Sequence, residues 1–296
     1  MRPVSRVSDS RGPVDTVLLH IQTEGWKAIQ ALAMPAPFFI VLAFATKGRH
    51  RLVSDIIKAA RQTRINLLVH FTDMILVAPL VLVTIVVMRD FFTAHGLSVV
   101  PVGGWKSMPV VVTGIVAVVF SDFIGYWRHR LEHTALLWPS HAVHHSDDEM
   151  TWLAIFRFHP INRFSTTIID FSFLLLMGLP AYALMVAIFV KHNYGAFIHA
   201  DLPWTFGRLG YIFVSPAMHR WHHAKDSRAY NTNYATVISV FDLAFGTFRV
   251  PGRCDVPLGV PDRMSPGFIG QMVHPFKPSS YRMFLGSLLR SRSKRA

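Results

Sequence analysis

The stretch that decides the fold runs from Val110 to His145 and reads VVVTGIVAVVFSDFIGYWRHRLEHTALLWPSHAVHH. Its first part belongs to an apolar run from Pro109 to Trp127, which approaches the roughly 20 residues that a helix needs to cross a bilayer. Five histidines follow directly, between positions 129 and 145. This order predicts a membrane helix that ends in a cluster of histidines.

The rest of the chain has the composition of a membrane protein. Of the 296 residues, 51% are hydrophobic and 16% are charged, whereas soluble domains carry about 25% charged residues. Further apolar runs cover Ala28–Thr46, Leu67–Met88 and Thr166–Val190, and the last is interrupted by Gly178-Leu179-Pro180. We therefore predict an all-α, multi-pass membrane helical bundle.

Positive charge indicates the orientation of these runs. The formal net charge is +13, and Lys and Arg gather beside the apolar runs, as in cytoplasmic loops. We predict that segment 47–66 and the chain from Arg128 onward face the cytosol and that the loop 89–108 lies outside. No nucleic-acid-binding module accompanies the charge, so no nucleic-acid partner is expected.

Cysteine and glycine patterns exclude several cofactors. Cys254 is the single cysteine, which excludes an internal disulfide, a cysteine-ligated zinc site and an iron–sulfur cluster. No glycine-rich dinucleotide fingerprint follows a predicted strand, so we expect no nucleotide-binding site in this chain.

The histidines have the spacing of metal ligands. Residues three and four apart share one face of a helix, and neutral imidazole suits iron, copper, zinc and nickel. A pair four residues apart is followed by two triplets with spacing i, i+3, i+4. The eight residues are His129, His133, His141, His144, His145, His219, His222 and His223. Eight imidazoles exceed what one ion binds, so we predict a histidine-rich dimetal site on a cytosolic helical cap.

This site has consequences for topology and for the neighbouring acids. Both histidine regions must share one side of the membrane, so Thr166–Val190 should cross an even number of times, as a hairpin. Asp122 precedes His129 by seven residues and is a candidate acceptor for a ligand imidazole, or else a polar contact between helices. Asp147 and Asp148 are interpreted as a solvated turn.

Of the eight histidines outside these motifs, His192 is interpreted as a structural or interfacial residue, and five are interpreted as surface or lipid-headgroup residues: His20, His50, His70, His95 and His274.

From about Asp122 to Phe248 the chain resembles the fatty acid hydroxylase and sterol desaturase superfamily of integral-membrane histidine-box enzymes. The resemblance rests on the boxes above and on five further elements: Arg157-Phe-His-Pro160, His199-Ala-Asp-Leu-Pro203, Pro216-Ala-Met, Asn233-Tyr-Ala and Phe241-Asp-Leu-Ala-Phe-Gly-Thr247. It implies His199 as a ninth ligand, and it makes His159 a candidate for ligation or for a position behind the ligands. Asp242 is a candidate acceptor behind the ligands. Residues 1–108 form an N-terminal region with two expected membrane helices and no matched element, 109–250 the catalytic domain, and 251–296 an irregular basic tail.

The resemblance also implies an activity. Members of this superfamily use two iron ions and O2 as co-substrate to hydroxylate an unactivated C–H bond of a membrane lipid. Zinc is a possible replacement for iron in purified material. Lipid desaturation on the same site is the alternative, and a metal transporter or a zinc-dependent membrane protein is a third reading. A separate electron donor of ferredoxin or cytochrome type and a bacterial inner membrane are expected, while the particular lipid and the oligomeric state stay open.

Overall fold

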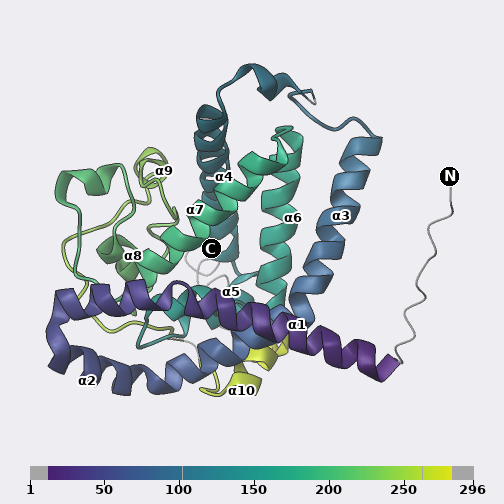
Figure 1. Cartoon of the computed structure of the whole chain (residues 1–296). Helices are drawn as coiled ribbons and strands as arrows, with labels where there is room; N and C mark the ends of the chain where they lie inside the picture. The colour runs from purple at the N-terminus through teal and green to yellow at the C-terminus, as the bar shows by residue number, and fades with distance from the viewer. Residues whose placement is uncertain (1–12, 102, 262, 282–296) are drawn as a thin grey trace, which may run out of the picture.

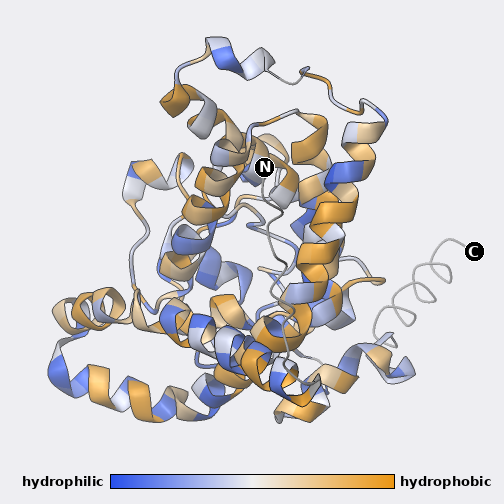
Figure 2. Ribbon diagram, turned by 45° about the vertical axis from the view of Figure 1, so that its right-hand side comes forward, coloured by the Kyte–Doolittle hydropathy of each residue, from blue (hydrophilic) through white to orange (hydrophobic). Residues whose placement is uncertain are grey.

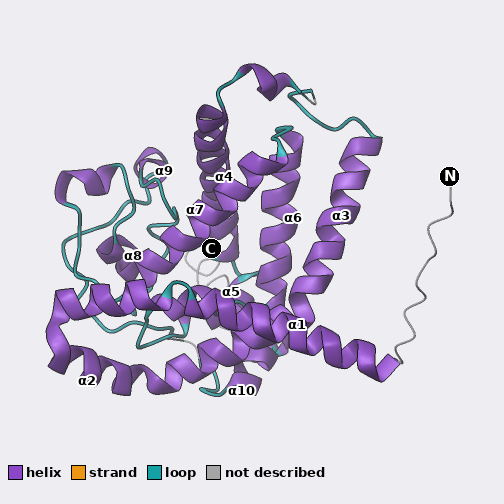
Figure 3. Ribbon diagram, viewed as in Figure 1, coloured by secondary structure: helices purple, strands orange, loops and turns teal. Residues whose placement is uncertain are grey.

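The computed structural model describes residues 13–101, 103–261 and 263–281. Over these residues the chain is helical with irregular connections and forms no strand (Figure 3), which confirms the all-α prediction. The helices are α1 (Pro13–Ala33), α2 (Ala36–Thr72), α3 (Ala78–Ala94), α4 (Val110–Glu132), α5 (Trp138–His145), α6 (Pro160–Leu176), α7 (Ala181–His199), α8 (Pro216–His222), α9 (Val240–Ala244) and α10 (Phe268–Val273).

Four helices form the membrane bundle. Helix α4 packs against α6 and α7, and α6 packs against α3, so the four stand beside one another (Figure 1). Their outward residues are largely hydrophobic (Figure 2), as at Leu82 on α3, Val111 on α4 and Phe189 on α7. Segments long and apolar enough to cross a membrane lie within Val14–Ala94, at Val110–Glu132 and at Ala181–His199.

The interrupted run Thr166–Val190 is a hairpin, as predicted. Helix α6 ends at Leu176 and α7 begins at Ala181. Gly178 in the turn has φ +64°, and a Cβ there would lie 2.1 Å from the carbonyl oxygen of Val100, so only glycine fits. The loop before α4 covers this turn, since Val99 N donates to the Leu176 carbonyl at 2.7 Å.

The N-terminal helices differ from the sequence prediction. The run Ala28–Thr46 is divided at Met34–Pro35, and both α1 and α2 lie across the foot of the upright helices (Figure 1). The basic segment 47–66, expected as a loop, is largely helical within α2. Gly48 bends α2 with φ +73° and ψ 167°, so its two arms, 36–47 and 49–72, fold back along each other.

The chain turns upward between α2 and α3 through a π-helical turn, Asp73–Val77. Pro79 lacks an N–H, so the carbonyl of Ile75 loses its partner in the helical ladder. The exposed side chain of His20 lies with its Nε2 3.0 Å from that oxygen and donates to it. An exposed histidine of α1 therefore fixes the start of the upright helix.

The remainder of the described chain gathers at the foot of the bundle, where α5, α8 and the loops up to residue 281 cover the ends of α4 and α7 (Figure 1). Two histidines interpreted as surface residues are buried there: His70 donates to the Ala28 carbonyl at 3.0 Å, and His274 packs beside Ser280. The basic stretch 290–295 lies outside the described residues.

Candidate metal centre

Short, proline-initiated helices carry most of the predicted ligands. Pro139 and Pro216 stand in the first turns of α5 and α8, where the missing N–H costs nothing. Ser215 caps α8 by accepting from Met218 N at 3.1 Å. These two helices and the C-terminal ends of α4 and α7 meet at the foot of the bundle.

The nine predicted histidines come together in two groups. In each group, one potential ligand atom per residue lies within 4.8 Å of all the others. The five-histidine group is His129, His133, His141, His145 and His222, and the four-histidine group is His144, His199, His219 and His223. The groups are adjacent, because the rings of His145 and His223 stack at 4.2 Å.

Each triplet is divided between the groups. On α5, His141 and His145 face the five-histidine group, whereas His144 faces the other. On α8 the assignment is reversed, since His219 belongs with His223 in the four-histidine group and His222 crosses to the first. Positions i and i+4 therefore act as a pair, and position i+3 reaches the neighbouring centre.

The nitrogen spacing in both groups fits a bound cation. His129 donates from Nδ1 to the Tyr234 carbonyl at 2.7 Å, and His141 Nδ1 lies 3.2 Å from Asn162 Oδ1. Their Nε2 atoms then carry lone pairs, yet they lie 3.0 Å apart. Two ligands at right angles, each about 2.1 Å from an ion, would be separated by about 3.0 Å.

The four-histidine group repeats this geometry. His199 donates from Nδ1 to the Gly195 carbonyl at 2.6 Å, and its Nε2 lies 3.1 Å from His144 Nε2 and 3.0 Å from His219 Nε2. In the five-histidine group, the buried Nε2 atoms of His133 and His222 have no hydrogen-bond partner among the described residues. Both groups therefore present convergent lone pairs, and the residues fit a metal ion in each.

Burial keeps the imidazoles neutral. It lowers the pKa of His141 to about 3, and it lowers the pKa of His222 to about 4, because an interior of low dielectric disfavours the charged ring. Neutral rings at pH 7 are available as ligands without the loss of a proton.

An irregular loop segment, residues 232–238, orients two ligands of the five-histidine group. Its carbonyl at Tyr234 accepts from His129, and its carbonyl at Thr232 accepts from His222 Nδ1 at 2.7 Å. Such partners fix the tautomer and the direction of a ligand imidazole.

Asp122 and Asp242 bind this loop segment rather than the histidines. Asp122 accepts from three consecutive backbone N–H groups, those of Thr236 at 3.2 Å, Val237 at 3.1 Å and Ile238 at 2.7 Å. Asp242 accepts from the two preceding backbone N–H groups, Tyr234 N at 2.7 Å and Ala235 N at 2.9 Å. The expectation that Asp122 directly accepts from a ligand is corrected, because Asp122 is linked to His129 only through the backbone of loop segment 232–238.

His159, a candidate for ligation or support, belongs to neither group. Its Nδ1 accepts from Ile161 N at 3.1 Å and caps α6, and its Nε2 donates to the Met272 carbonyl at 3.1 Å. It therefore fixes the start of the hairpin.

Two polar residues behind the site were not foreseen. Asn162 contacts His141 as described, and the buried Glu132 lies 3.5 Å from His141 Nδ1 while it accepts from Arg128 at 2.6 Å. Glu132 stands inside the first histidine box, so its position was a usable signal, whereas Asn162 carried none.

The turn after the second box is buried rather than solvated at its first residue. Asp147 is 0% exposed and accepts from Asn66 at 2.9 Å, with Arg157 Nη1 3.7 Å away. Arg157 in turn donates to Gln62 at 2.7 Å. These bonds dock the second arm of α2 onto the end of α5.

Comparison with known proteins agrees with this site. The fatty acid hydroxylase family model matches residues 114–247, a segment that holds all nine histidines. The ornithine lipid hydroxylase OlsE of Rhizobium tropici is 31% identical over 180 residues, which are 60% of this chain and 54% of that protein.

Two further relatives match shorter stretches of the chain. Alkylglycerol monooxygenase of Caenorhabditis elegans is 30% identical over 49% of this chain and 29% of its own length. The Delta(7)-sterol 5(6)-desaturase ERG3A of Gibberella zeae is 29% identical over 45% of this chain and 37% of its own length. The chain thus spans about half the length of the first relative and less of the others, and no solved structure matches.

The boxed histidines, the helical fold and these matches agree on one class of protein, the integral-membrane histidine-box proteins. Residues 114–247 resemble the fatty acid hydroxylase family, and the relatives that the chain matches are named as a hydroxylase, a monooxygenase and a desaturase.

Proposed function

We propose that this protein is an integral-membrane oxidoreductase that uses two iron ions and O2 to hydroxylate an unactivated C–H bond of a lipid. The observation that carries the proposal is the pair of buried groups in which nine neutral imidazoles converge at the foot of a membrane bundle. Iron held by these residues would supply the redox chemistry and the activation of O2, which side chains alone do not provide.

The chain's own contribution is binding, orientation and the exclusion of water. The two groups would hold one ion each, and the Thr232 and Tyr234 carbonyls would keep the rings of His222 and His129 aligned. Only His133 among the nine is more than slightly exposed. A site closed in this way protects reactive chemistry from bulk solvent.

The location of the groups supports a lipid substrate and argues against transport. Transporters place their ligands near the bilayer midplane, on interrupted helices. Here the ligands lie at the ends of α4 and α7 and on the short helices beneath them (Figure 1). We propose that this end faces the cytosol of a bacterial inner membrane and that a separate ferredoxin or cytochrome delivers electrons to its basic surface.

Desaturation is the second candidate, favoured by the sterol desaturase among the relatives. One experiment separates the two reactions: the protein in lipid nanodiscs receives a reducing system, heavy-isotope O2 and a membrane lipid extract. Hydroxylation adds a labelled oxygen to a lipid, whereas desaturation removes two hydrogens and adds no label. His222→Ala should abolish either product, and His95→Ala, an exposed site directly after the end of α3, should not. Oxidation that survives in His222→Ala would refute the proposal.

A further inference from the structure

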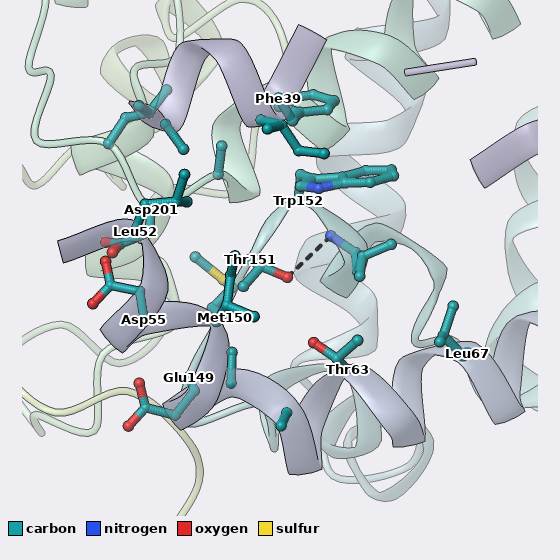
Figure 4. Close-up of a pocket in the computed structure, with 18 of the residues that line it drawn as sticks. Phe39, Leu52, Asp55, Thr63, Leu67, Glu149, Met150, Thr151, Trp152 and Asp201 are labelled. Atoms are coloured by element: carbon teal, nitrogen blue, oxygen red, sulfur yellow. Dashed lines mark hydrogen bonds between the residues drawn. The ribbon is translucent and has the colours of Figure 1, made fainter. Parts of the chain in front are cut away.

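An apolar cavity lies beside the four-histidine group, between the two arms of α2. Its volume is about 780 Å³, within the roughly 300–1,000 Å³ of small-molecule sites. Phe39 and Leu42 of the first arm and Ile56 and Leu67 of the second line it. Figure 4 shows Phe39 lying against Trp152 in this wall, and their rings stack at 4.9 Å.

The segments that carry the ligands also close this cavity. Ala200 and Arg220, next in sequence to His199 and His219, both line it, as does the stretch 148–153 that follows α5. A molecule in the cavity would therefore lie against the chain neighbours of two ligands of the four-histidine group.

One end of the cavity is polar and ion-paired. Asp55 and Asp201 lie together at that end in Figure 4, away from Phe39 and Trp152. Lys47 bridges the two acids, with its Nζ 2.6 Å from Asp55, and Arg220 lies 3.0 Å from Asp201. The apolar cavity thus ends in a fixed network of charges.

A second pocket, of about 700 Å³, begins at this network and shares Lys47, Asp55, Asp201 and Arg220 with the first. Five basic side chains and three aspartates line it; the basic ones are Lys47, Arg51, Lys58, Arg220 and Arg253. Arg51, Lys58 and Arg253 form no salt bridge with the described residues. These three cations and one acid, Asp255, form no salt bridge with the described residues, so the pocket carries an excess of positive charge.

An apolar chamber joined to a cationic one matches an amphiphile with a negative head. We propose that the two pockets bind the lipid substrate, with its acyl chain between the arms of α2 and its phosphate or carboxylate headgroup among Arg51, Lys58 and Arg253. This assignment rests on the proposed function and adds to it the substrate class, an anionic lipid. Charge-assisted bonds from Arg and Lys are the strong contacts that oxyanions make in proteins.

Binding can be measured without turnover, on the purified protein in detergent with no reductant. The probes are pyrene-labelled phosphatidic acid and pyrene-labelled diacylglycerol, which differ in the headgroup alone. The anionic probe should bind about tenfold more tightly or better, the ratio expected from one or two charged hydrogen bonds. R51Q/K58Q/R253Q should remove this preference, whereas K106Q/R208Q/R263Q, which deletes the same charge outside both pockets, should keep it.

The apolar chamber has its own matched pair. Ala43→Trp fills the cavity and should weaken both probes about tenfold or more, while Ala45→Trp, two residues along the same arm and outside the lining, should not. Equal binding of the two probes, or an unchanged preference in the triple variant, overturns the proposal. If inorganic phosphate displaces the anionic probe and Ala43→Trp binds normally, the site takes a free anion and the proposal is wrong.

These outcomes are distinct from failure of the proposed function. Selective binding without any oxidation in the nanodisc assay would remove the oxygenase proposal and leave the lipid site. Oxidation by a protein whose variants bind both probes as the wild type does would remove the lipid site alone.

Discussion

Replacing Asp122 with Ala tests whether loop segment 232–238 positions the ligands of the five-histidine group in particular. The substitution removes the acceptor of three backbone N–H groups. An unsatisfied buried donor costs about 1–3 kcal/mol. Val237 is buried, whereas Thr236 and Ile238 are partly open to water, so we expect the free energy of unfolding to fall by roughly 2–4 kcal/mol, one full penalty and two reduced ones.

The more specific effect is on metal affinity. Loop segment 232–238 carries the carbonyl groups that accept from His129 and His222, both in the five-histidine group. Loss of such outer partners typically costs about 10–100-fold in affinity, so one of two ions should be lost while the other stays. Asp122→Asn keeps one acceptor oxygen and should show a smaller loss of both stability and affinity.

The assay is elemental mass spectrometry after dialysis against a graded series of chelator concentrations, with thermal unfolding recorded in parallel. Asp73→Ala is the matched control, because its partly buried carboxylate binds Arg163 at 3.1 Å and makes no contact with loop segment 232–238. It should lower stability and leave both ions in place. Equal loss of both ions in Asp122→Ala, or the same pattern in Asp73→Ala, would refute the reasoning.

Two further substitutions test the frame around the site. Gly178→Ala should lower the unfolding temperature in detergent, because a Cβ would lie 2.1 Å from the Val100 carbonyl oxygen and the residue has a φ of +64°. The control Gly25→Ala, which has open space around the added Cβ, should keep the wild-type unfolding temperature. An unchanged unfolding temperature in Gly178→Ala would mean that the hairpin turn is built differently. His274→Ala should lower the free energy of unfolding by about 1–3 kcal/mol, because its buried hydrogen bond with Ser280 is lost. Unfolding curves measure this loss, and elemental analysis should show an unchanged metal content. A variant as stable as the wild type would favour the original interpretation of His274 as a surface residue.

Hydropathy predicted the upright helices well and the N-terminal region poorly. Gly178 and Pro180 interrupt an apolar run too sharply for one helix, so the α6–α7 hairpin could be predicted. The run Ala28–Thr46 is equally apolar, yet it lies across the foot of the bundle (Figure 1). Hydropathy indicates that a helix lies in an apolar environment, but it does not give the orientation of the helix relative to the bundle. Gly48 permits a bend in α2, but the angle of that bend depends on tertiary packing, which the local sequence does not reveal.

Spacing predicted the members of the metal centre but not their arrangement. Eight histidines followed from i, i+3 and i+4, and His199 followed from family resemblance. The crossing of His144 and His222 between groups depends on how α5 and α8 face each other. The carbonyls of Thr232 and Tyr234 have no side-chain signature, so Asp122 could be placed near the site but not in its actual role.

The central claim is that the two histidine groups each hold a metal ion, and the most direct test is the metal content of the detergent-purified protein beside His222→Ala and the control His95→Ala. With one ion in each group, we expect about two iron ions per chain in the wild type and in His95→Ala, and about one in His222→Ala. A well-folded wild-type protein without bound metal, or a His222→Ala variant with the full complement, would contradict it.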